Sequence, residues 1–194
     1  MNKLLLTSLL SICIFFGNAQ SNPAGLKVND KAPEFSGKDQ HGKTITLNNE
    51  LKKGKVVLIF YRGQWCPYCN KELKSITDSL SLISSKGASV VAITPELPEN
   101  VTKTIDKTKA SYSIISDNGL KIMKAYDVSY AVEGEMAAKY KSYGIDFMKA
   151  NGSNGANLPV PAVYVIDTNG NIIYRYFDVD YHNRASVMEI VAHL

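Results

Sequence analysis

Three short runs of apolar, mostly β-branched residues recur along the chain, and each has the length of a buried strand. They cover residues 56–61 (VVLIFY), 89–94 (SVVAIT) and 163–166 (VYVI). Continuous apolar runs without polar alternation are typical of strands that are covered on both faces, in the centre of an α/β sheet. A weaker run of the same kind, at residues 112–115 (YSII), predicts a further strand.

Helical spacing follows the first of these runs. Leu73, Ile76, Leu80 and Ile83 recur every three or four residues, and Gly87 supplies a stop signal. This pattern predicts one amphipathic helix that ends near the glycine.

The later elements complete an alternating order. We expect a short helix over 120–125 behind the turn at 116–119, and a last helix over 186–194. Residues 167–170 (DTNG) carry an Asn-Gly hairpin signal that leads into a strand over 171–176. The order predicts an α/β fold with a central mixed β-sheet flanked by helices, in which the last hairpin supplies the antiparallel part.

One connection does not fit this scheme. Residues 130–158 are weakly helical and then rich in Gly and Asn, and they join a helix to a strand. Connections in such folds usually take 2–6 residues. The segment is therefore an insertion, and both a lid or specificity loop and a plain surface excursion remain open.

The start of the chain predicts a secretory signal peptide over residues 1–20. Lys3 precedes an apolar run over 4–16, and small and polar residues follow. This run would form a helix of about 20 Å, shorter than the ~30 Å of hydrocarbon in a membrane. We expect cleavage, loss of Cys13 with the peptide, no stable membrane insertion afterwards, and a periplasmic or secreted protein in an oxidising compartment.

The mature chain, residues 21–194, has the size of one domain with a full core. The formal charge of the full chain, +4, is spread along the sequence, and no Lys/Arg block alternates with aromatic residues. We therefore expect no nucleic acid partner. The two cysteines that remain are too few for a disulfide scaffold.

These two cysteines form a Cys66-Pro67-Tyr68-Cys69 motif directly after the first apolar run. The amides of a first helical turn have no helical partners, so a thiolate placed there is stabilised and its pKa falls. Pro67 suits a helix start, and Cys69 lies one turn along, close enough to resolve a mixed disulfide at Cys66. The motif predicts a redox pair.

Other uses of a cysteine pair fit less well. A structural zinc site needs four ligands, and the only histidines, His41, His182 and His193, are distant in sequence. Haem attachment would need histidine at position 70, where Asn70 stands. A disulfide across two residues closes too short a loop to stabilise the chain much. We expect no metal and no other cofactor.

A family resemblance extends over nearly the whole mature chain. Its general residues are 32–35 (APEF), Gly42-Lys43 with Ile45 and Leu47, 57–61 (VLIFY), Cys69 with Glu72, 116–117 (SD), and 165–167 (VID) with Gly170. More specific are 60–63 (FYRG), 65–69 (WCPYC) and 158–161 (LPVP). Together they resemble the peroxiredoxin-like branch of the alkyl hydroperoxide reductase/thiol-specific antioxidant (AhpC/TSA) family, in the thioredoxin-fold superfamily. The resemblance implies a thioredoxin-like fold and hydroperoxide reduction.

The chain departs from the peroxiredoxin pattern at the residues that handle peroxide. Cys69 takes the place of the peroxidatic cysteine, Cys66 replaces the Thr or Ser three residues before it, and Arg62 replaces the Pro. The distant Arg of the family falls on Pro161. Three of the four positions are changed, although Arg62 could supply a guanidinium from the other side.

Pro161 corresponds instead to the proline that thioredoxins keep in the cis form opposite the disulfide, so we expect a cis bond before it. Thioredoxins use the first cysteine of the motif as nucleophile and the second as resolver. The thioredoxin reading assigns attack to Cys66, whereas the peroxiredoxin reading assigns it to Cys69. Both assignments remain open at this point.

Four further residues are considered for a role at the cysteine pair. Trp65 and Tyr68 border the thiols, either as a partner-docking rim or as ordinary packing. Glu72 lies one helical turn past Cys69, either to relay protons or at a solvated helix face. His182 is expected in a surface loop, with nothing in the sequence that places it near the cysteines.

We therefore predict an enzyme that reduces hydroperoxides through Cys66 and Cys69 and is re-reduced by a thioredoxin-type donor. The alternative is an exported thiol–disulfide oxidoreductase that acts on protein thiols and disulfides without peroxidase activity. A third reading is a redox-sensing domain without turnover.

Overall fold

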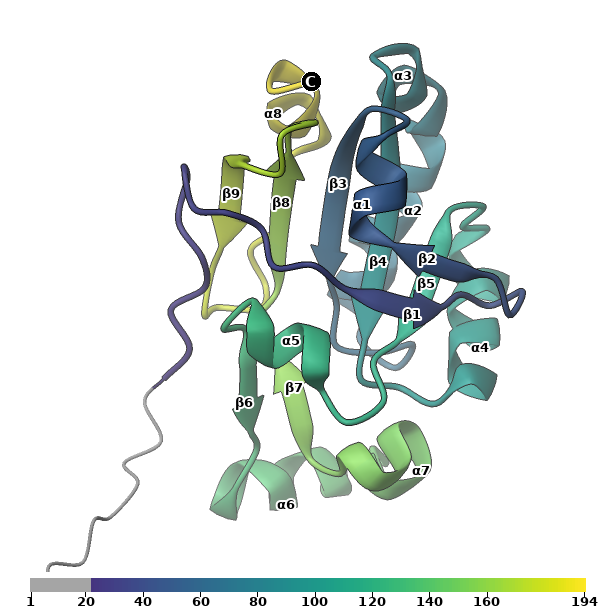
Figure 1. Ribbon diagram of the computed structural model, residues 1–194. Coiled ribbons are helices and arrows are strands. Elements are labelled where there is room, and N and C mark those ends of the chain that lie inside the picture. The colour runs from purple at the N-terminus through teal and green to yellow at the C-terminus, as the bar shows by residue number, and fades with distance from the viewer. Residues whose placement is uncertain (1–21) are drawn as a thin grey trace, which may run out of the picture.

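A five-stranded mixed sheet forms the centre of the computed structural model, which describes residues 22–194 (Figure 1). The spatial order is β5-β4-β3-β8-β9, with β3, β4 and β5 parallel and β8 and β9 antiparallel to their neighbours. Its strands are β3 (Lys55–Phe60), β4 (Ala88–Thr94), β5 (Ser113–Ser116), β8 (Ala162–Ile166) and β9 (Ile172–Phe177). This confirms the predicted mixed sheet and its antiparallel hairpin.

Side chains of the central strands alternate between two hydrophobic cores. Val56, Leu58 and Phe60 of β3 point into one core, whereas Val57 and Ile59 point into the other. All five are fully buried. Both faces of the strand are therefore covered, which is why its sequence shows no polar alternation.

Helices cover both faces of the sheet. One core takes side chains from α1 (Leu47–Leu51) and α5 (Lys121–Ala125). The other takes side chains from α2 (Pro67–Asp78), α3 (Leu80–Ser85), α4 (Pro98–Thr108) and α8 (Val187–Ala192). A two-stranded hairpin, β1 (Ser36–Lys38) with β2 (Thr44–Thr46), lies beside α1.

The prediction of one continuous helix from Leu73 to Ile83 is wrong. The chain forms two helices here, α2 and α3, which are separated at Ser79. Ser79 has φ −104° and ψ 9°, outside the helical range. It follows Thr77 and Asp78, two residues of low helix propensity that favour helix ends. Gly87, at φ +73°, follows the end of α3 and supplies the predicted stop.

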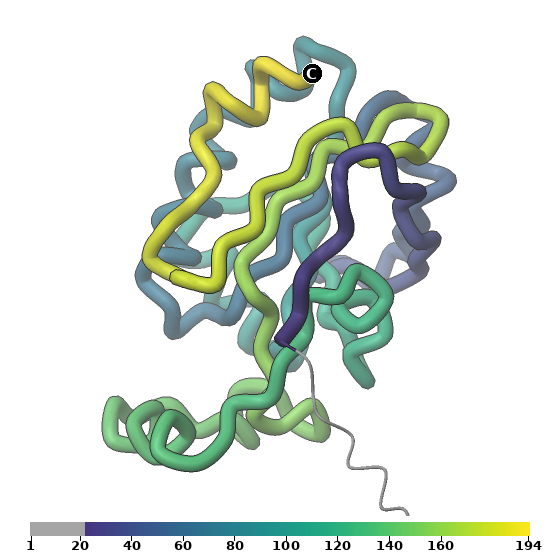
Figure 2. Tube along the Cα trace, turned by 90° about the vertical axis from the view of Figure 1, so that its left-hand side faces the viewer, coloured from purple at the N-terminus to yellow at the C-terminus, as the bar shows by residue number. Residues whose placement is uncertain are grey.

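The insertion at 130–158 is ordered and has its own core. It contains β6 (Ser129–Ala131), α6 (Gly134–Ser142), α7 (Phe147–Asn151), a 3-10 turn η1 (Gly152–Asn154) and β7 (Asn157–Pro159). β6 pairs with β7, and the helices lie together beyond one end of the central sheet (Figures 1 and 2). The buried side chains of this small core are Val132, Tyr140, Phe147 and Leu158.

Asparagine side chains attach the insertion to the rest of the fold. The Asn154 amide nitrogen donates to the carbonyl oxygens of Pro95 (2.8 Å) and Asp117 (3.0 Å), and its oxygen accepts from the Gly119 amide (2.9 Å). The Asn100 amide donates to two carbonyls of α7. Asn154 therefore ties the Gly/Asn-rich part of the insertion to the backbone after β4 and β5, and the insertion is an ordered part of the fold.

The predicted signal peptide lies outside the described residues. Within residues 22–194, no helix has the length and apolar character needed to span a bilayer.

Replacement of Asn154 by alanine tests this attachment. Asn154→Ala leaves two buried carbonyl groups, of Pro95 and Asp117, and the partly buried Gly119 amide without this partner, so we expect the free energy of unfolding to fall by about 2–4 kcal/mol. Urea denaturation measures the loss. The control is Asn118→Ala, at an exposed position, which should change stability by less than about 0.5 kcal/mol. Equal effects of the two substitutions would contradict the assignment.

Candidate active site

Cys66 lies at the junction between β3 and α2, where the predicted helix start is confirmed. It is the N-cap residue of α2, in extended backbone conformation, and Pro67 occupies the first turn. The Cys66 sulfur accepts a hydrogen bond from the Cys69 amide at 3.3 Å. A sulfur at this position satisfies one of the free amides of the first turn and lies at the positive end of the helix dipole.

The two cysteine sulfurs face each other inside the protein. They are 2.7 Å apart, and both cysteines are free thiols. Cys66 is 1 % exposed and Cys69 is 0 % exposed. The pair needs little movement to become a disulfide, and a reagent must enter the protein to reach either sulfur.

The pair divides into one acidic and one non-acidic thiol. The hydrogen bond from the Cys69 thiol lowers the pKa of Cys66 to about 6, and the positive charges of Arg62 and Arg184 act in the same direction. Burial, together with the charge and hydrogen bond of Cys66, raises the pKa of Cys69 well above its usual value. Near neutral pH the site therefore holds a Cys66 thiolate and a Cys69 thiol.

Arg62 supplies a buried guanidinium beside Cys66. The side chain is 1 % exposed, and its central carbon lies 4.0 Å from the ring centre of Tyr181, 5.0 Å from Trp65 and 5.3 Å from Tyr140. It also donates a hydrogen bond to the Tyr140 hydroxyl. Cation–π contacts of this kind hold a guanidinium that water does not reach. Tyr140 comes from α6, so the insertion helps to hold a charge of the site.

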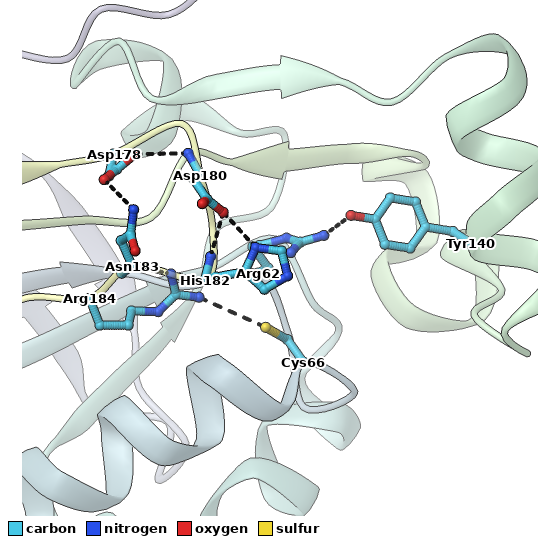
Figure 3. A network of polar contacts seen from close by, with 8 residues as sticks. All are labelled: Arg62, Cys66, Tyr140, Asp178, Asp180, His182, Asn183 and Arg184. Carbon is cyan, nitrogen blue, oxygen red and sulfur yellow. Dashed lines mark hydrogen bonds and ion pairs between the residues drawn. The ribbon is translucent and has the colours of Figure 1, made fainter.

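Arg184 places a second guanidinium at the thiols. Its Nη2 lies 3.4 Å from the Cys69 sulfur. The Cys66 sulfur lies 3.9 Å from the same atom (Figure 3). The family position of the distant Arg falls on Pro161, which predicted the loss of this charge. An arginine nevertheless reaches the site, because the loop between β9 and α8 brings residue 184 over the start of α2.

The loop that carries Arg184 also carries His182. Asp178 and Asp180 accept hydrogen bonds that shape it, from the Asp180 amide, the His182 amide and the Asn183 side chain (Figure 3). The His182 ring is exposed and packs against Tyr68 and Tyr181. His182 is a surface loop residue, as predicted, but its loop does come close to the thiols.

Two buried carboxyl groups accompany the cysteines. Glu72 is 7 % exposed, and its Oε2 lies 3.0 Å from Arg184 Nε, so the reading as a solvated helix face is wrong. Glu96, after β4, accepts from the Gln64 amide at 2.8 Å. Burial raises the pKa of both Glu72 and Glu96 to about 8. Neither acid was expected to be buried, and Glu96 was not singled out in the sequence.

The two aromatic residues of the motif have different surroundings. Trp65 packs edge-on against Tyr140 and Phe147 of the insertion. Tyr68 is 38 % exposed and contacts Tyr181 and His182. Ordinary packing therefore accounts for Trp65, while Tyr68 remains the one aromatic of the motif at the surface.

The expected cis bond before Pro161 is wrong, since residues 22–194 contain no cis peptide bond. Pro161 lies directly before β8, next to the last β3–β8 pair, Phe60 with Ala162. It is therefore at the end of the sheet where β3 leads into Arg62. Proline has no amide hydrogen, so a trans proline is tolerated at a strand start without loss of a sheet hydrogen bond.

The described part of the chain holds no group of three or more His, Cys, Asp or Glu side chains that could bind a metal ion.

Comparison with known sequences identifies the family. The profile described as "AhpC/TSA family" matches residues 28–175, most of the chain. The chain belongs to the AhpC/TSA family. This confirms the family predicted from the sequence, and with it membership of a family of oxidoreductases.

Curated relatives of this AhpC/TSA protein include peroxiredoxins of plants. Peroxiredoxin Q, chloroplastic, of Populus jackii is 30 % identical over 138 residues, which cover 70 % of this chain and 64 % of that protein. Peroxiredoxin Q, chloroplastic, of Gentiana triflora is 31 % identical over 114 residues, which cover 59 % and 52 %. The matched part of the chain thus spans about half to two thirds of the length of these relatives.

Solved structures of low identity share the fold. Peroxidoxin BcpB from Mycobacterium tuberculosis superposes with a TM-score of 0.67 at 22 % identity, covering 87 % of this chain and 96 % of that one. The thioredoxin domain of a thiol-disulfide oxidoreductase from Bacteroides vulgatus superposes with a TM-score of 0.56 at 19 % identity, covering 86 % and 99 %. The predicted thioredoxin-like fold is confirmed.

Arg184, like Glu96 and Tyr140, is a site residue that sequence reasoning missed, and one signal pointed to Arg184. The chain has only three arginines, Arg62, Arg175 and Arg184, among 22 basic residues. Proteins prefer arginine to lysine where a buried cation must form several fixed hydrogen bonds. In a chain that otherwise uses lysine, each arginine was therefore a candidate for a buried site.

The protonation of the pair can be tested by removing the second thiol. Cys69→Ala deletes the hydrogen bond to Cys66, so we expect the pKa of Cys66 to rise from about 6 toward about 8.5, the value of a free thiol. The ultraviolet absorbance of the thiolate against pH measures it. Cys69→Ser keeps a donor and should give a smaller rise. A pKa unchanged in both variants would contradict the assignment.

The burial of Glu96 makes stability depend on pH. A carboxyl whose pKa is raised by folding favours the folded state below its unfolded pKa, and this contribution is lost as the pH rises to about 8. Glutamine imitates the protonated acid, so Glu96→Gln should gain stability relative to the wild type between about pH 5 and pH 8. Urea denaturation across this range tests it. Glu99→Gln, at an exposed neighbour, should show no such trend, and a flat difference for Glu96→Gln would refute the prediction.

Proposed function

We propose that this AhpC/TSA protein is a thiol peroxidase that reduces hydroperoxides through Cys66 and Cys69. The observation that carries the proposal is a stabilised thiolate with a second thiol 2.7 Å away, inside a protein of this family. A nucleophilic sulfur and a resolving sulfur are thus both in place.

We further propose that Cys66 attacks first. Alignment with the family puts Cys69 in the peroxidatic position, but Cys69 is the buried, protonated partner. Cys66 accepts hydrogen bonds from both the amide and the thiol of Cys69, and Arg62 lies beside it. The thiolate is the reactive form of cysteine, so these contacts favour Cys66 as the nucleophile.

The reaction is written in two steps. The Cys66 thiolate attacks one peroxide oxygen, the O–O bond breaks, and the alcohol or water leaves after taking up a proton, which converts Cys66 to a sulfenic acid. The Cys69 sulfur then attacks the Cys66 sulfur, the S–O bond breaks, and water leaves with the proton of Cys69. The product is the Cys66–Cys69 disulfide.

A thioredoxin-type donor would return the disulfide to the dithiol by thiol–disulfide exchange. The sequence of residues 1–20 supports export to the periplasm or beyond as part of this proposal. An exported enzyme would need a donor on the same side of the membrane.

A second function, thiol–disulfide exchange with protein substrates, is favoured by one observation. Attack by the first cysteine of the motif is the order that thioredoxins use. Against it, both sulfurs are buried, and a folded protein would reach them only after the surrounding elements moved. Small hydroperoxides fit the closed arrangement better.

Parallel assays on the mature protein separate these functions. Hydrogen peroxide consumption with a thioredoxin-type reductant should exceed the rate of a free thiol by several orders of magnitude, and insulin reduction should be slow. A peroxide rate no better than free thiol together with brisk insulin reduction would favour the second function. Inactivity in both assays would indicate a redox-sensing domain.

Matched serine variants identify the attacking sulfur. Cys69→Ser should retain a Cys66 sulfenic acid that reacts with dimedone, because the attacking thiolate remains and the resolver is gone. Cys66→Ser should give no dimedone adduct. The reverse pattern would assign the attack to Cys69.

A further inference from the structure

Arg184 lies outside the part of the chain that the family profile matches, which ends at residue 175. It nevertheless contacts the reactive pair. Its Nη2 is closer to the Cys69 sulfur, at 3.4 Å, than to the Cys66 sulfur, at 3.9 Å. The chain therefore brings a cation of its own to the thiol that the family pattern treats as peroxidatic and the geometry treats as the resolver.

The Arg184 side chain is held from both ends. Its Nε lies 3.0 Å from Glu72 Oε2, which is ion-pair distance once the Glu72 carboxyl ionises at its raised pKa of about 8. Its Nη1 donates to the Asn183 carbonyl at 2.8 Å. These contacts leave Nη2 directed at the Cys66 sulfur (Figure 3), with the Cys69 sulfur also within reach. Glu72, on the same helix as Cys69, is thus a positioning residue for the guanidinium.

We propose that Arg184 is a catalytic residue of the resolving step, where its guanidinium stabilises the negative charge that develops on the Cys69 sulfur as Cys69 attacks Cys66. This inference rests on the Cys66/Cys69 pair of the proposed function. It does not depend on peroxide, because Cys69 resolves a sulfenic acid and a mixed disulfide at Cys66 in the same way.

The order of events follows from the charges around Cys69. While Cys66 is a thiolate, its charge and hydrogen bond keep the pKa of Cys69 high, along with burial. Once Cys66 has reacted, that negative charge is gone. The groups that then face Cys69 are Arg184 from the β9–α8 loop, the carboxyls of Glu72 on α2 and Glu96 after β4, and the backbone amide of Arg62 after β3. Arg184 is the cation among them, and it lies at hydrogen-bond distance from the Cys69 sulfur.

A small neutral disulfide, 4,4′-dithiodipyridine, measures attack and resolution separately. The Cys66 thiolate attacks it, which forms a mixed disulfide and releases one pyridinethione. The Cys69 thiol then attacks the Cys66 sulfur, which forms the Cys66–Cys69 disulfide and releases the second pyridinethione with the thiol proton. Each release changes the absorbance, so stopped-flow mixing resolves two phases.

Arg184→Gln should slow the second phase roughly 10- to 100-fold, the range for loss of one charge-assisted hydrogen bond, and slow the first phase much less. The rate of the second phase should also need a higher pH to reach its plateau than in the wild type. Arg184→Lys, which keeps the charge but not the fork of donors, should recover part of the rate. Glu72→Gln should show a weaker form of the same defect.

Arg175→Gln is the matched control. Arg175 lies on β9 and donates to the Ala24 carbonyl, away from the thiols, so both phases should keep their wild-type rates. Unchanged second-phase rate and pH profile in Arg184→Gln would overturn the inference, as would equal slowing of both phases or a wild-type protein that releases fewer than two pyridinethiones. Two-phase release without peroxide turnover would overturn the proposed function alone.

Discussion

The hydrogen bond from the Cys69 thiol to the Cys66 sulfur stabilises a negative charge inside the protein, and much of the surrounding structure compensates for that charge. A buried anion without partners is strongly unfavourable. The first turn of α2 supplies an amide and the helix dipole. Two arginines then supply positive charge from different parts of the chain. Arg62 follows β3, and Arg184 lies in the loop between β9 and α8.

Each compensating charge needs partners in turn. Arg62 is buried as deeply as the cysteine, so it depends on the aromatic rings of Trp65, Tyr140 and Tyr181. Tyr140 belongs to the insertion, whose own core includes Trp65 at its edge. The insertion is therefore part of the electrostatic support of the thiolate, through Arg62. Arg184 lies 3.0 Å from the carboxyl of Glu72, which is itself buried.

Most of the fold could be predicted from the sequence, because its signals are local. The unbroken apolar runs identify the buried strands, and the Asn-Gly turn identifies the last hairpin. A helix whose buried face is polar has no clear hydrophobic periodicity in its sequence. The buried face of α4 includes Asn100, Thr104 and Thr108, so hydrophobic spacing alone does not identify this helix. The break at Ser79 and the order within 130–158 depended on packing that hydrophobic spacing does not describe.

The site divides in the same way. The sequence by itself determined the redox pair and its place at a helix start, because four consecutive residues and a preceding strand contain that information, and it determined the family through motifs spread along the mature chain. Only the tertiary structure decided which sulfur carries the charge and which cations face it. Tyr140 meets Arg62 across 78 residues of chain, and Arg184 meets Cys66 across 118. Contacts at such separations follow from the path of the whole chain, and no local pattern contains them.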